Sequence, residues 1–269
     1  MLPAREKIAR IIGNFDLVGG LSGGDIATIH HLRTQSGDFA LKSGERLPQG
    51  MFASEAFGLR LMAECNVATP EIIEQNEDFL LMRYLAPGRR DERSAGVMLA
   101  RLHSRHAEQF GLDRDTYLAT RLQNNKRNAD WADFYFRQRI FPLLGELAVS
   151  DLMRWEKFSE RARPFVAGCG RPALLHGDLW SGNLYYSVTG PVFIDPACYF
   201  GDPLIDIAMT RLFGGFGGDF YQAYHAVTGK RESEADLLRI YQLYPLLVHA
   251  RLFGGGYYRS ACALRDAFL

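Results

Sequence analysis

The chain has 269 residues, which is enough for one large domain or two modest ones with their own apolar cores. Its 31 basic and 31 acidic side chains balance, so no basic excess indicates a nucleic acid or an anionic membrane as a partner. We expect neither a membrane span nor an export signal, and four widely spaced cysteines without a CxxC pair favour free thiols in the cytoplasm.

The first third of the chain is predicted to be a small antiparallel sheet with two helices. Isoleucines at helical spacing indicate a helix near the N-terminus, and short β-like runs separated by turn residues indicate an antiparallel meander. A second helix carries Phe52, Ala56, Leu59 and Met62 on one face. The predicted helices cover 3–12 and 52–64, and the predicted strands cover 18–25, 26–34, 38–45, 72–73 and 79–82.

The remainder of the chain is predicted to be mostly helical. Pro87-Gly88 interrupts the pattern, and a segment rich in Gly, Asp and Pro between 172 and 201 indicates short strands and loops. Pro245 is expected to kink or split the last helix. The predicted helices cover 93–108, 131–148, 150–166, 203–213, 217–227 and 233–260. Strands followed by helices predict a two-part α+β protein, with an N-terminal lobe over 1–86 and a C-terminal lobe over 87–269.

The strongest chemical pattern follows a short apolar run in the second half of the chain. His176 and Asp178 belong to a His-Gly-Asp triplet, Asn183 comes five positions after Asp178, and Asp195 ends a second apolar run. Phosphoryl transfer from ATP needs a carboxylate for the proton of the attacking hydroxyl, and oxygen ligands that hold Mg²⁺ on the phosphates. The spacing matches the catalytic segment of kinases, with Asp-Pro-Ala in place of Asp-Phe-Gly. A plain Gly-Asp turn would explain each element alone, but not the combination.

Lys42 ends the third predicted strand, where its ammonium group can contact the α- and β-phosphates of ATP. Glu55, on the helix that follows, is its expected ion-pair partner. A lone lysine on a strand is more often solvated, but the order of strand, helix and catalytic segment favours the nucleotide site.

Two further segments are candidates for nucleotide contacts. A glycine-rich stretch precedes the Lys42 strand. By itself it is better explained as a hairpin turn, but its position allows its backbone N–H groups to approach phosphates. The segment between the two predicted lobes could pair with adenine through the Arg83 carbonyl and the Leu85 N–H, or be a plain connector. The glycines concerned are Gly19, Gly20, Gly23 and Gly24.

Several longer segments resemble the fructosamine kinase (ketosamine-3-kinase) family, an aminoglycoside-phosphotransferase-like branch of the protein-kinase-like folds. The resemblance covers roughly residues 5–260 and is carried by LLHGDLWSGN, FIDPACYFGDPLIDIAMTRLFGGF, YQLYPLLVHARLFGGGYY, MFASEAFGLRLMAE and AGVMLARLH. Tryptophan directly after the Asp-Leu of the triplet is more specific than His-Gly-Asp alone, which antibiotic and choline kinases share.

This resemblance implies a two-lobed kinase-like fold, with a small antiparallel-sheet N-lobe and a larger helical C-lobe. It implies ATP, Mg²⁺ and a sugar hydroxyl on a ketosamine such as a fructosamine or ribulosamine, in a deglycation role, with a glycated protein as a further potential substrate. The implied roles are base for Asp178, Mg²⁺ ligands for Asn183 and Asp195, phosphate contacts for Lys42 with Glu55, sugar contact for Trp180, and structural support for His176 and Asp206.

Two positions depart from the family pattern. Asp25 stands where members often have a cysteine in the glycine-rich loop, so no redox-switching disulfide is expected there. Arg83 replaces a common acidic residue in the connecting segment, which is tolerable if only the backbone binds adenine.

Other functions are kept as alternatives. The chain could be an aminoglycoside or choline phosphotransferase, although the basic character of residues 109–150 disfavours a polycationic substrate. It could also be a noncatalytic nucleotide-binding protein, although Lys42, Asp178, Asn183 and Asp195 are all present. The sugar, the amine carrier and the oligomeric state are left open.

Overall fold

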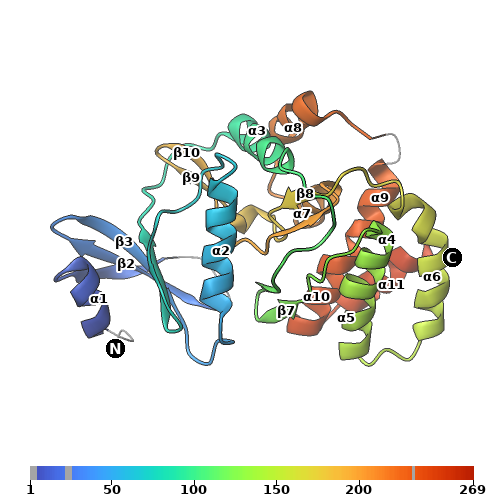
Figure 1. Ribbon diagram of the computed structural model, residues 1–269, viewed down its shortest axis with the longest axis horizontal. Helices are drawn as coiled ribbons and strands as arrows, with labels where there is room; N and C mark the ends of the chain where they lie inside the picture. The colour runs from blue at the N-terminus through green and yellow to red at the C-terminus, as the bar shows by residue number, and fades with distance from the viewer. Residues whose placement is uncertain (1–4, 22–25, 232–233) are drawn as a thin grey trace.

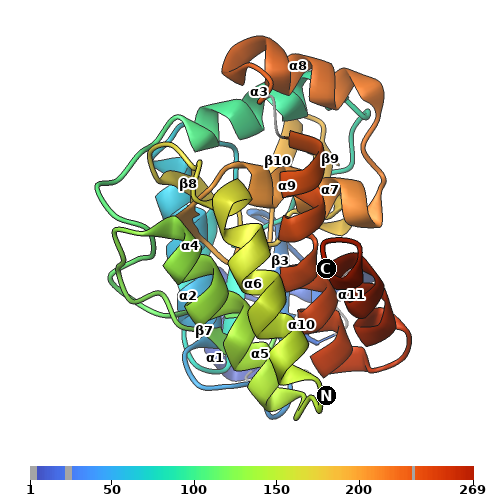
Figure 2. The ribbon, with the colours of Figure 1, turned by 90° about the vertical axis from the view of Figure 1, so that its right-hand side faces the viewer.

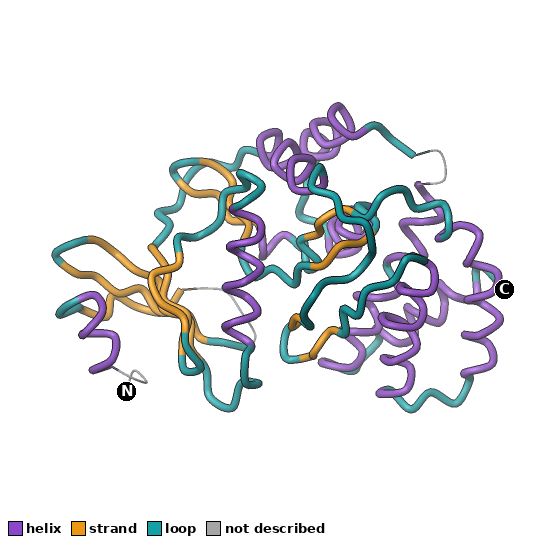
Figure 3. The backbone as a smooth tube through the Cα atoms, in the orientation of Figure 1, coloured by secondary structure: helices purple, strands orange, loops and turns teal. Residues whose placement is uncertain are grey.

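The computed structural model describes residues 5–21, 26–231 and 234–269 (Figure 1). A twisted sheet with helix α1 lies at one end of the long axis, and most of the helices lie at the other end, with helix α2 between them. The tube in Figure 3 shows the same separation of strands from helices. The predicted two-part α+β architecture is therefore confirmed.

The sheet has five antiparallel strands in the order β1-β2-β3-β5-β4. The first three form the predicted meander, although residues 22–25 of the predicted first strand lie outside the described residues. Side chains alternate along β5, because successive residues of a strand point to opposite faces. The strands are β1 Asp16–Leu21, β2 Thr28–Thr34, β3 Gly37–Ser43, β4 Ile72–Gln75 and β5 Phe79–Arg83.

Two separate apolar clusters use the two faces of this sheet. Helix α1 (Arg5–Ile12) buries Ile8 against one face, together with Phe79 and Leu81 of β5. Leu80 and Met82 belong instead to the main core, which also contains the predicted apolar face of α2 (Met51–Ala63). Helix α2 therefore joins the sheet to the helical part of the molecule.

The helical part contains most of the predicted helices, with altered ends. The segment predicted as one helix over 131–148 is two α-helices joined by a π-helical turn, Tyr135–Ile140. No helix within the described ranges is long and apolar enough to cross a membrane. The α-helices are α3 Glu92–His103, α4 Trp131–Phe134, α5 Phe141–Glu146, α6 Leu152–Val166, α7 Leu204–Phe213, α8 Gly218–Thr228, α9 Glu234–Tyr241, α10 Leu243–Phe253 and α11 Tyr257–Asp266.

The predicted last helix is divided into α9, α10 and α11. The first break falls at Gln242, three residues before Pro245, so the proline lies in the first turn of α10. A proline is tolerated there because the N–H groups of the first turn have no intrahelical acceptor. The second break was not predicted, and it coincides with Gly254 and Gly255, both at a φ of 65°.

Three two-stranded ladders complete the molecule. The segment 172–201 contains short strands and loops as predicted, whereas the hairpin of β6 and β7 was not predicted. These strands are β6 Thr116–Leu118 with β7 Arg121–Gln123, β8 Ala173–Leu175 with β11 Tyr199–Gly201, and β9 Leu184–Ser187 with β10 Gly190–Phe193.

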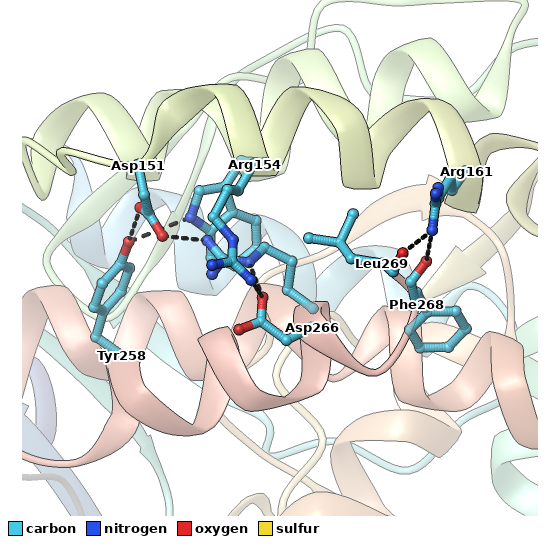
Figure 4. Close-up of polar contacts among 9 residues, drawn as sticks. Asp151, Arg154, Arg161, Tyr258, Asp266, Phe268 and Leu269 are labelled. Atoms are coloured by element: carbon cyan, nitrogen blue, oxygen red, sulfur yellow. Dashed lines mark hydrogen bonds and ion pairs between the residues drawn. The ribbon is translucent and has the colours of Figure 1, made fainter.

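The C-terminal helix is held against α6 by polar contacts (Figure 4). Asp151 pairs with the buried Arg265 and accepts a hydrogen bond of 2.8 Å from the Tyr258 hydroxyl. Arg154 lies 3.0 Å from Asp266, and Arg161 donates to the carbonyl oxygen of Leu269. The view in Figure 2 shows α6, α10 and α11 packed at this end of the molecule. These contacts hold α11 and the residues that follow it against α6.

Candidate active site

The predicted catalytic segment forms the loop between β8 and β9, and Asn183 is tied to Asp178 within it. The Asn183 Nδ2 atom donates to the Asp178 carbonyl oxygen at 2.8 Å and to Asp178 Oδ2 at 3.0 Å. Gly177 has a φ of 80°, and a Cβ atom there would overlap the Ala197 carbonyl oxygen. This position therefore requires glycine, because a side chain would push the loop away from the segment that follows Asp195.

Asp206 supports the same loop from below. It is fully buried on α7, where Oδ2 accepts a hydrogen bond from His176 N at 2.8 Å and Oδ1 accepts one from Gly177 N at 2.9 Å. His103 of α3 was missed by the sequence analysis, yet its Nε2 atom lies 3.1 Å from Asp206 Oδ2. Its other ring nitrogen lies 2.9 Å from the Tyr224 hydroxyl. A buried carboxylate is stable in a core only with such partners.

His176 connects the loop to the strand that precedes Asp195. Its Nδ1 atom accepts a hydrogen bond from Asp178 N at 3.2 Å, so the proton of the neutral ring is on Nε2, which donates to the Ile194 carbonyl oxygen at 2.9 Å. Burial lowers the pKa of His176 and favours this neutral form. The ring therefore sets the spacing between Asp178 and Asp195 and is not placed as a proton donor to substrate.

Lys42, Glu55 and Asp195 form a charged cluster between the sheet, α2 and the end of β10. Lys42 Nζ lies 2.8 Å from Glu55 Oε2 and 2.8 Å from Asp195 Oδ1. Burial alone would lower the pKa of Lys42, but the two carboxylates outweigh it and raise that pKa. Lys42 thus stays charged, which suits a group that contacts phosphates.

The two carboxylates of this cluster differ in their surroundings. Burial raises the pKa of Glu55, and its Oε1 atom has no hydrogen-bond partner among the described residues. Burial acts in the same direction on Asp195, but Lys42 lowers the pKa of Asp195 and favours its charged form. Asp195 has a φ of 53°, in the left-handed region that non-glycine residues seldom adopt. Such backbone strain is commonly found at functional sites.

The pKa of Asp178 is raised well above its ordinary value by burial and by the charge of Asp195. Asp178 is nevertheless only partly buried, so a substrate can approach this residue. A carboxylate with a raised pKa is a stronger base than an ordinary aspartate, provided that it is ionised at the working pH.

Mg²⁺ is the metal that this donor set fits. Asn183 uses its Nδ2 group on Asp178 and keeps its amide oxygen for a ligand, and Ile194 N donates to the Asn183 carbonyl oxygen at 3.1 Å, so Asn183 lies beside the residue that precedes Asp195. Mg²⁺ bound to nucleotide phosphates uses only one or two protein oxygen ligands. A larger group of three or more His, Cys, Asp or Glu side chains suited to a metal is absent from the residues that the structure describes.

The segment between β5 and α3 contains the backbone N–H of Leu85, one of the two groups predicted to pair with adenine. Tyr84 N donates to the Asp38 carbonyl oxygen at 3.1 Å, and Arg83 N donates to the Glu71 carbonyl oxygen at 2.8 Å. The Leu85 N–H, by contrast, has no hydrogen-bond partner within the described part of the chain. That group is therefore available to a ligand, as the predicted contact requires.

The glycine-rich stretch is only partly described. Gly19 and Gly20 lie on β1, where a β-bulge interrupts the register, and a Cβ atom on either would meet no atom within 4 Å. Gly23, Gly24 and Asp25 lie outside the described residues. The described glycines are thus open on one side, and the predicted phosphate contact by this stretch stays a prediction.

Trp180 lies at the surface beside Asp178. Its side chain is 41% exposed, whereas Trp131 and Trp155 are 3% and 1% exposed. A Cβ atom on Gly182 would overlap the Trp180 ring, so the ring covers the backbone of the 3₁₀ turn Ser181–Asn183 and leaves part of its surface to solvent. Unlike Trp131 and Trp155, Trp180 is thus open to contact from solvent, and its predicted contact with a sugar stays a prediction.

Comparisons with known proteins agree with one another. The model of the fructosamine kinase family matches residues 14–269. A protein of Enterococcus faecium named probable ketoamine kinase is 38% identical over 91% of this chain and 93% of its own length. A chloroplastic protein-ribulosamine 3-kinase of Oryza sativa is 32% identical over 98% of this chain and 80% of its own length.

The likeness extends to solved structures. A Thermobifida fusca structure named as a candidate fructosamine-3-kinase has a TM-score of 0.88 at 26% identity and covers 98% of both chains. More distant phosphotransferases with identities below 20% share the fold alone. The predicted protein-kinase-like fold class is therefore confirmed.

Proposed function

The chain belongs to the fructosamine kinase family, and from this premise we propose that it transfers the terminal phosphoryl group of ATP to a sugar hydroxyl of a ketosamine. The observation that carries the proposal is the cluster of Lys42, Glu55 and Asp195 beside the loop that holds Asp178 and Asn183. Phosphoryl transfer depends mainly on positioning and charge, and this arrangement supplies both.

Asp178 is the proposed base. Asn183 holds Oδ2 of its carboxylate, while His176, Gly177 and Asp206 fix the backbone on which it sits. The carboxylate therefore needs no reorganisation before it accepts or orients the proton of the attacking hydroxyl. General bases of this kind act best when their orientation is set in advance.

Lys42, with Glu55 as its partner, would contact the phosphates of ATP, while Asn183 and Asp195 would hold Mg²⁺. When bound, the ion would neutralise part of the negative charge of the phosphates. Lys42 is already directed by Glu55 and Asp195, so its position does not depend on the nucleotide.

We assign nucleotide binding and acceptor binding to different lobes. We place the nucleotide on residues 1–86, with adenine paired to the Leu85 N–H and the Arg83 carbonyl and with the glycine-rich stretch near the phosphates. We place catalysis and acceptor binding on residues 87–269. All four cysteines are free thiols, which agrees with a reducing compartment and a cytoplasmic enzyme.

A phosphorylation screen tests the substrate class. Purified enzyme with Mg²⁺ and ATP would be given a free fructosamine, a free ribulosamine, a glycated protein, an aminoglycoside and choline, and phosphate transfer would be followed by mass spectrometry. We expect the ketosamines to be phosphorylated well above the other acceptors. A preference for the aminoglycoside or choline would overturn the substrate assignment, and a lack of ATP turnover with every acceptor would overturn the kinase assignment.

Replacement of the exposed ring tests the sugar contact. Trp180→Ala should raise the ketosamine KM about 5- to 10-fold, because the loss of an aromatic contact costs roughly 1 kcal/mol or somewhat more. The KM for ATP should be nearly unchanged. If Trp180 only packs on the loop, thermal stability and background ATP hydrolysis would fall together with ketosamine turnover, and initial-rate kinetics of the same variant separate the two cases.

A further inference from the structure

The segment that follows β5 is anchored to the hairpin of β9 and β10. Gly88 N donates to the Tyr186 carbonyl oxygen at 2.8 Å, and Val188 N donates to the Ala86 carbonyl oxygen at 3.0 Å. A Cβ atom on Gly88 would overlap the Ser187 carbonyl oxygen, so the two backbones are in direct contact. The backbone at Gly88 is thus held in place by the β9–β10 hairpin, and this defines where the residues that follow it begin.

Two charged residues after this anchor reach a loop that is more than a hundred positions away in sequence. Arg90 donates from its terminal nitrogen to the Gly215 carbonyl oxygen at 2.6 Å, and Gly217 N donates to Glu92 Oε1 at 2.9 Å. Arg90 Nε donates to the same Glu92 oxygen at 2.9 Å. We call this pair, Arg90 with Glu92, the clamp, and residues 214–217 between α7 and α8 the glycine loop.

The glycine loop is in contact with the clamp on one side and with the catalytic segment on the other. A Cβ atom on Gly217 would overlap the Glu92 carboxylate, and one on Gly215 would overlap the Ser181 side chain. Gly214 and Gly215 have φ values of 70° and 86°, which favour glycine. Ser181 directly follows Trp180, so the loop supports the turn over which the indole ring lies.

The clamp and the glycine loop lie at the ends of two helices, α3 and α8, that pack tightly against each other. Helices α3 and α8 pack side by side, as Figures 1 and 2 both show. They approach closely because Gly96 has no side chain: a Cβ atom there would overlap the Phe220 carbonyl oxygen. Glu92 begins α3 and Gly217 precedes α8, so their hydrogen bond joins the ends of two helices that cannot easily separate.

From this geometry we infer that Arg90 and Glu92 are positioning residues for acceptor specificity, which hold the glycine loop against Ser181 and thereby set the position of the Trp180 ring. Among the described residues, neither Arg90 nor Glu92 forms a hydrogen bond or ion pair with Lys42, Glu55 or Asp195, so the effect should fall on the acceptor and not on the nucleotide. The inference rests on the proposed function only for the identity of the acceptor.

Fluorescence quenching tests the clamp without any substrate. The chain has three tryptophans, and only Trp180 is exposed enough for acrylamide to reach, which a Trp180→Phe variant would verify. Release of the glycine loop by Glu92→Ala should increase the quenching of Trp180. Arg90→Ala should act in the same direction, and the double variant should add little, because residues of one hydrogen-bond network are not additive. Glu92→Gln keeps an acceptor for Gly217 N, so the quenching of Trp180 in this variant should be close to that of the wild type.

Kinetics of the same variants test the consequence for the acceptor. Glu92→Ala should raise the ketosamine KM by about 3- to 10-fold, the range that corresponds to the net contribution of a typical intramolecular hydrogen bond. The ATP KM and the background ATP hydrolysis should be unchanged. Glu160→Ala, an exposed glutamate of α6, is the matched control and should change none of these values.

The outcomes separate the clamp from the proposed function. If a folded Glu92→Ala variant shows the wild-type quenching and the wild-type ketosamine KM, the inference is overturned. It is also overturned if the melting temperature, ketosamine turnover and background ATP hydrolysis of this variant all fall together. Should Glu92→Ala not fold, Arg90→Ala decides, because that side chain is largely exposed. A wild-type enzyme that ignores ketosamines would overturn the proposed substrate, while the quenching result would still decide the clamp.

Discussion

Asp178→Asn is expected to lower kcat for ketosamine phosphorylation by about 10²- to 10⁴-fold, the usual range for the loss of a general base. The amide has nearly the same shape as the carboxylate, and its oxygen can still accept the hydrogen bond from Asn183 Nδ2. It cannot accept the proton of the attacking hydroxyl, however. Initial-rate kinetics at saturating ATP and ketosamine measure the effect.

The same variant should keep its fold and its nucleotide affinity. Burial and the Asp195 carboxylate raise the pKa of Asp178, which means that its ionised form is unfavourable in the folded protein. A neutral amide removes this cost, so the melting temperature without nucleotide should be equal to or higher than that of the wild type. Asp236→Asn on the exposed face of α9 is the matched control, with unchanged kcat. Near-normal turnover by Asp178→Asn would remove Asp178 from the mechanism.

Asp195→Ala is expected to abolish the Mg²⁺ dependence of nucleotide binding. In the wild type, a chelator should weaken ATP binding, because the proposed ion joins the phosphates to Asp195 and Asn183. The loss of outer-shell partners alone typically costs about 10- to 100-fold in metal affinity, and the loss of a ligand should cost at least as much. Calorimetric titration of ATP with Mg²⁺ and with chelator measures both states.

ATP binding in the presence of chelator is the control for the Asp195→Ala variant. In chelator, the Asp195→Ala variant and the wild type should bind ATP with similar affinity, because Lys42 keeps its contact with Glu55 at 2.8 Å. A variant that still binds ATP more tightly with Mg²⁺, to the same degree as the wild type, would contradict the assignment of Asp195 as a metal ligand. A fall in affinity in chelator as well would indicate that Asp195 acts by orienting Lys42.

The elements that sequence patterns predicted well are those set by nearby residues. The meander of β1 to β3, the apolar face of α2 and the strand-and-loop region around Asp178 depend on alternation, helical spacing and turn residues within about ten positions. The order of Lys42, Glu55, Asp178, Asn183 and Asp195 along the chain is likewise a property of the sequence, and it was enough to indicate phosphoryl transfer.

Helix ends were harder to predict, because packing decides them. The apolar pattern over 233–260 continues through α9, α10 and α11, so periodicity alone gives one helix. The breaks at Gln242 and at Gly254 and Gly255 are needed for α11 to fold back on α6, where Asp151 pairs with Arg265. Contacts over such a separation in sequence leave no local pattern.

The residues that hold the loop around Asp178 and the glycine loop in place could likewise be identified only from the tertiary structure. By itself, the sequence determined the fold class and the family, and it indicated which residues are candidates for the chemistry. Only the folded chain brings His103 to Asp206 across 103 positions, and Arg90 and Glu92 to the glycine loop across 125 positions. Their side chains carry no signature of a partner, because hydrogen bonding and charge pairing depend on distance in space, and that distance exists only after α3, α7 and α8 have packed together.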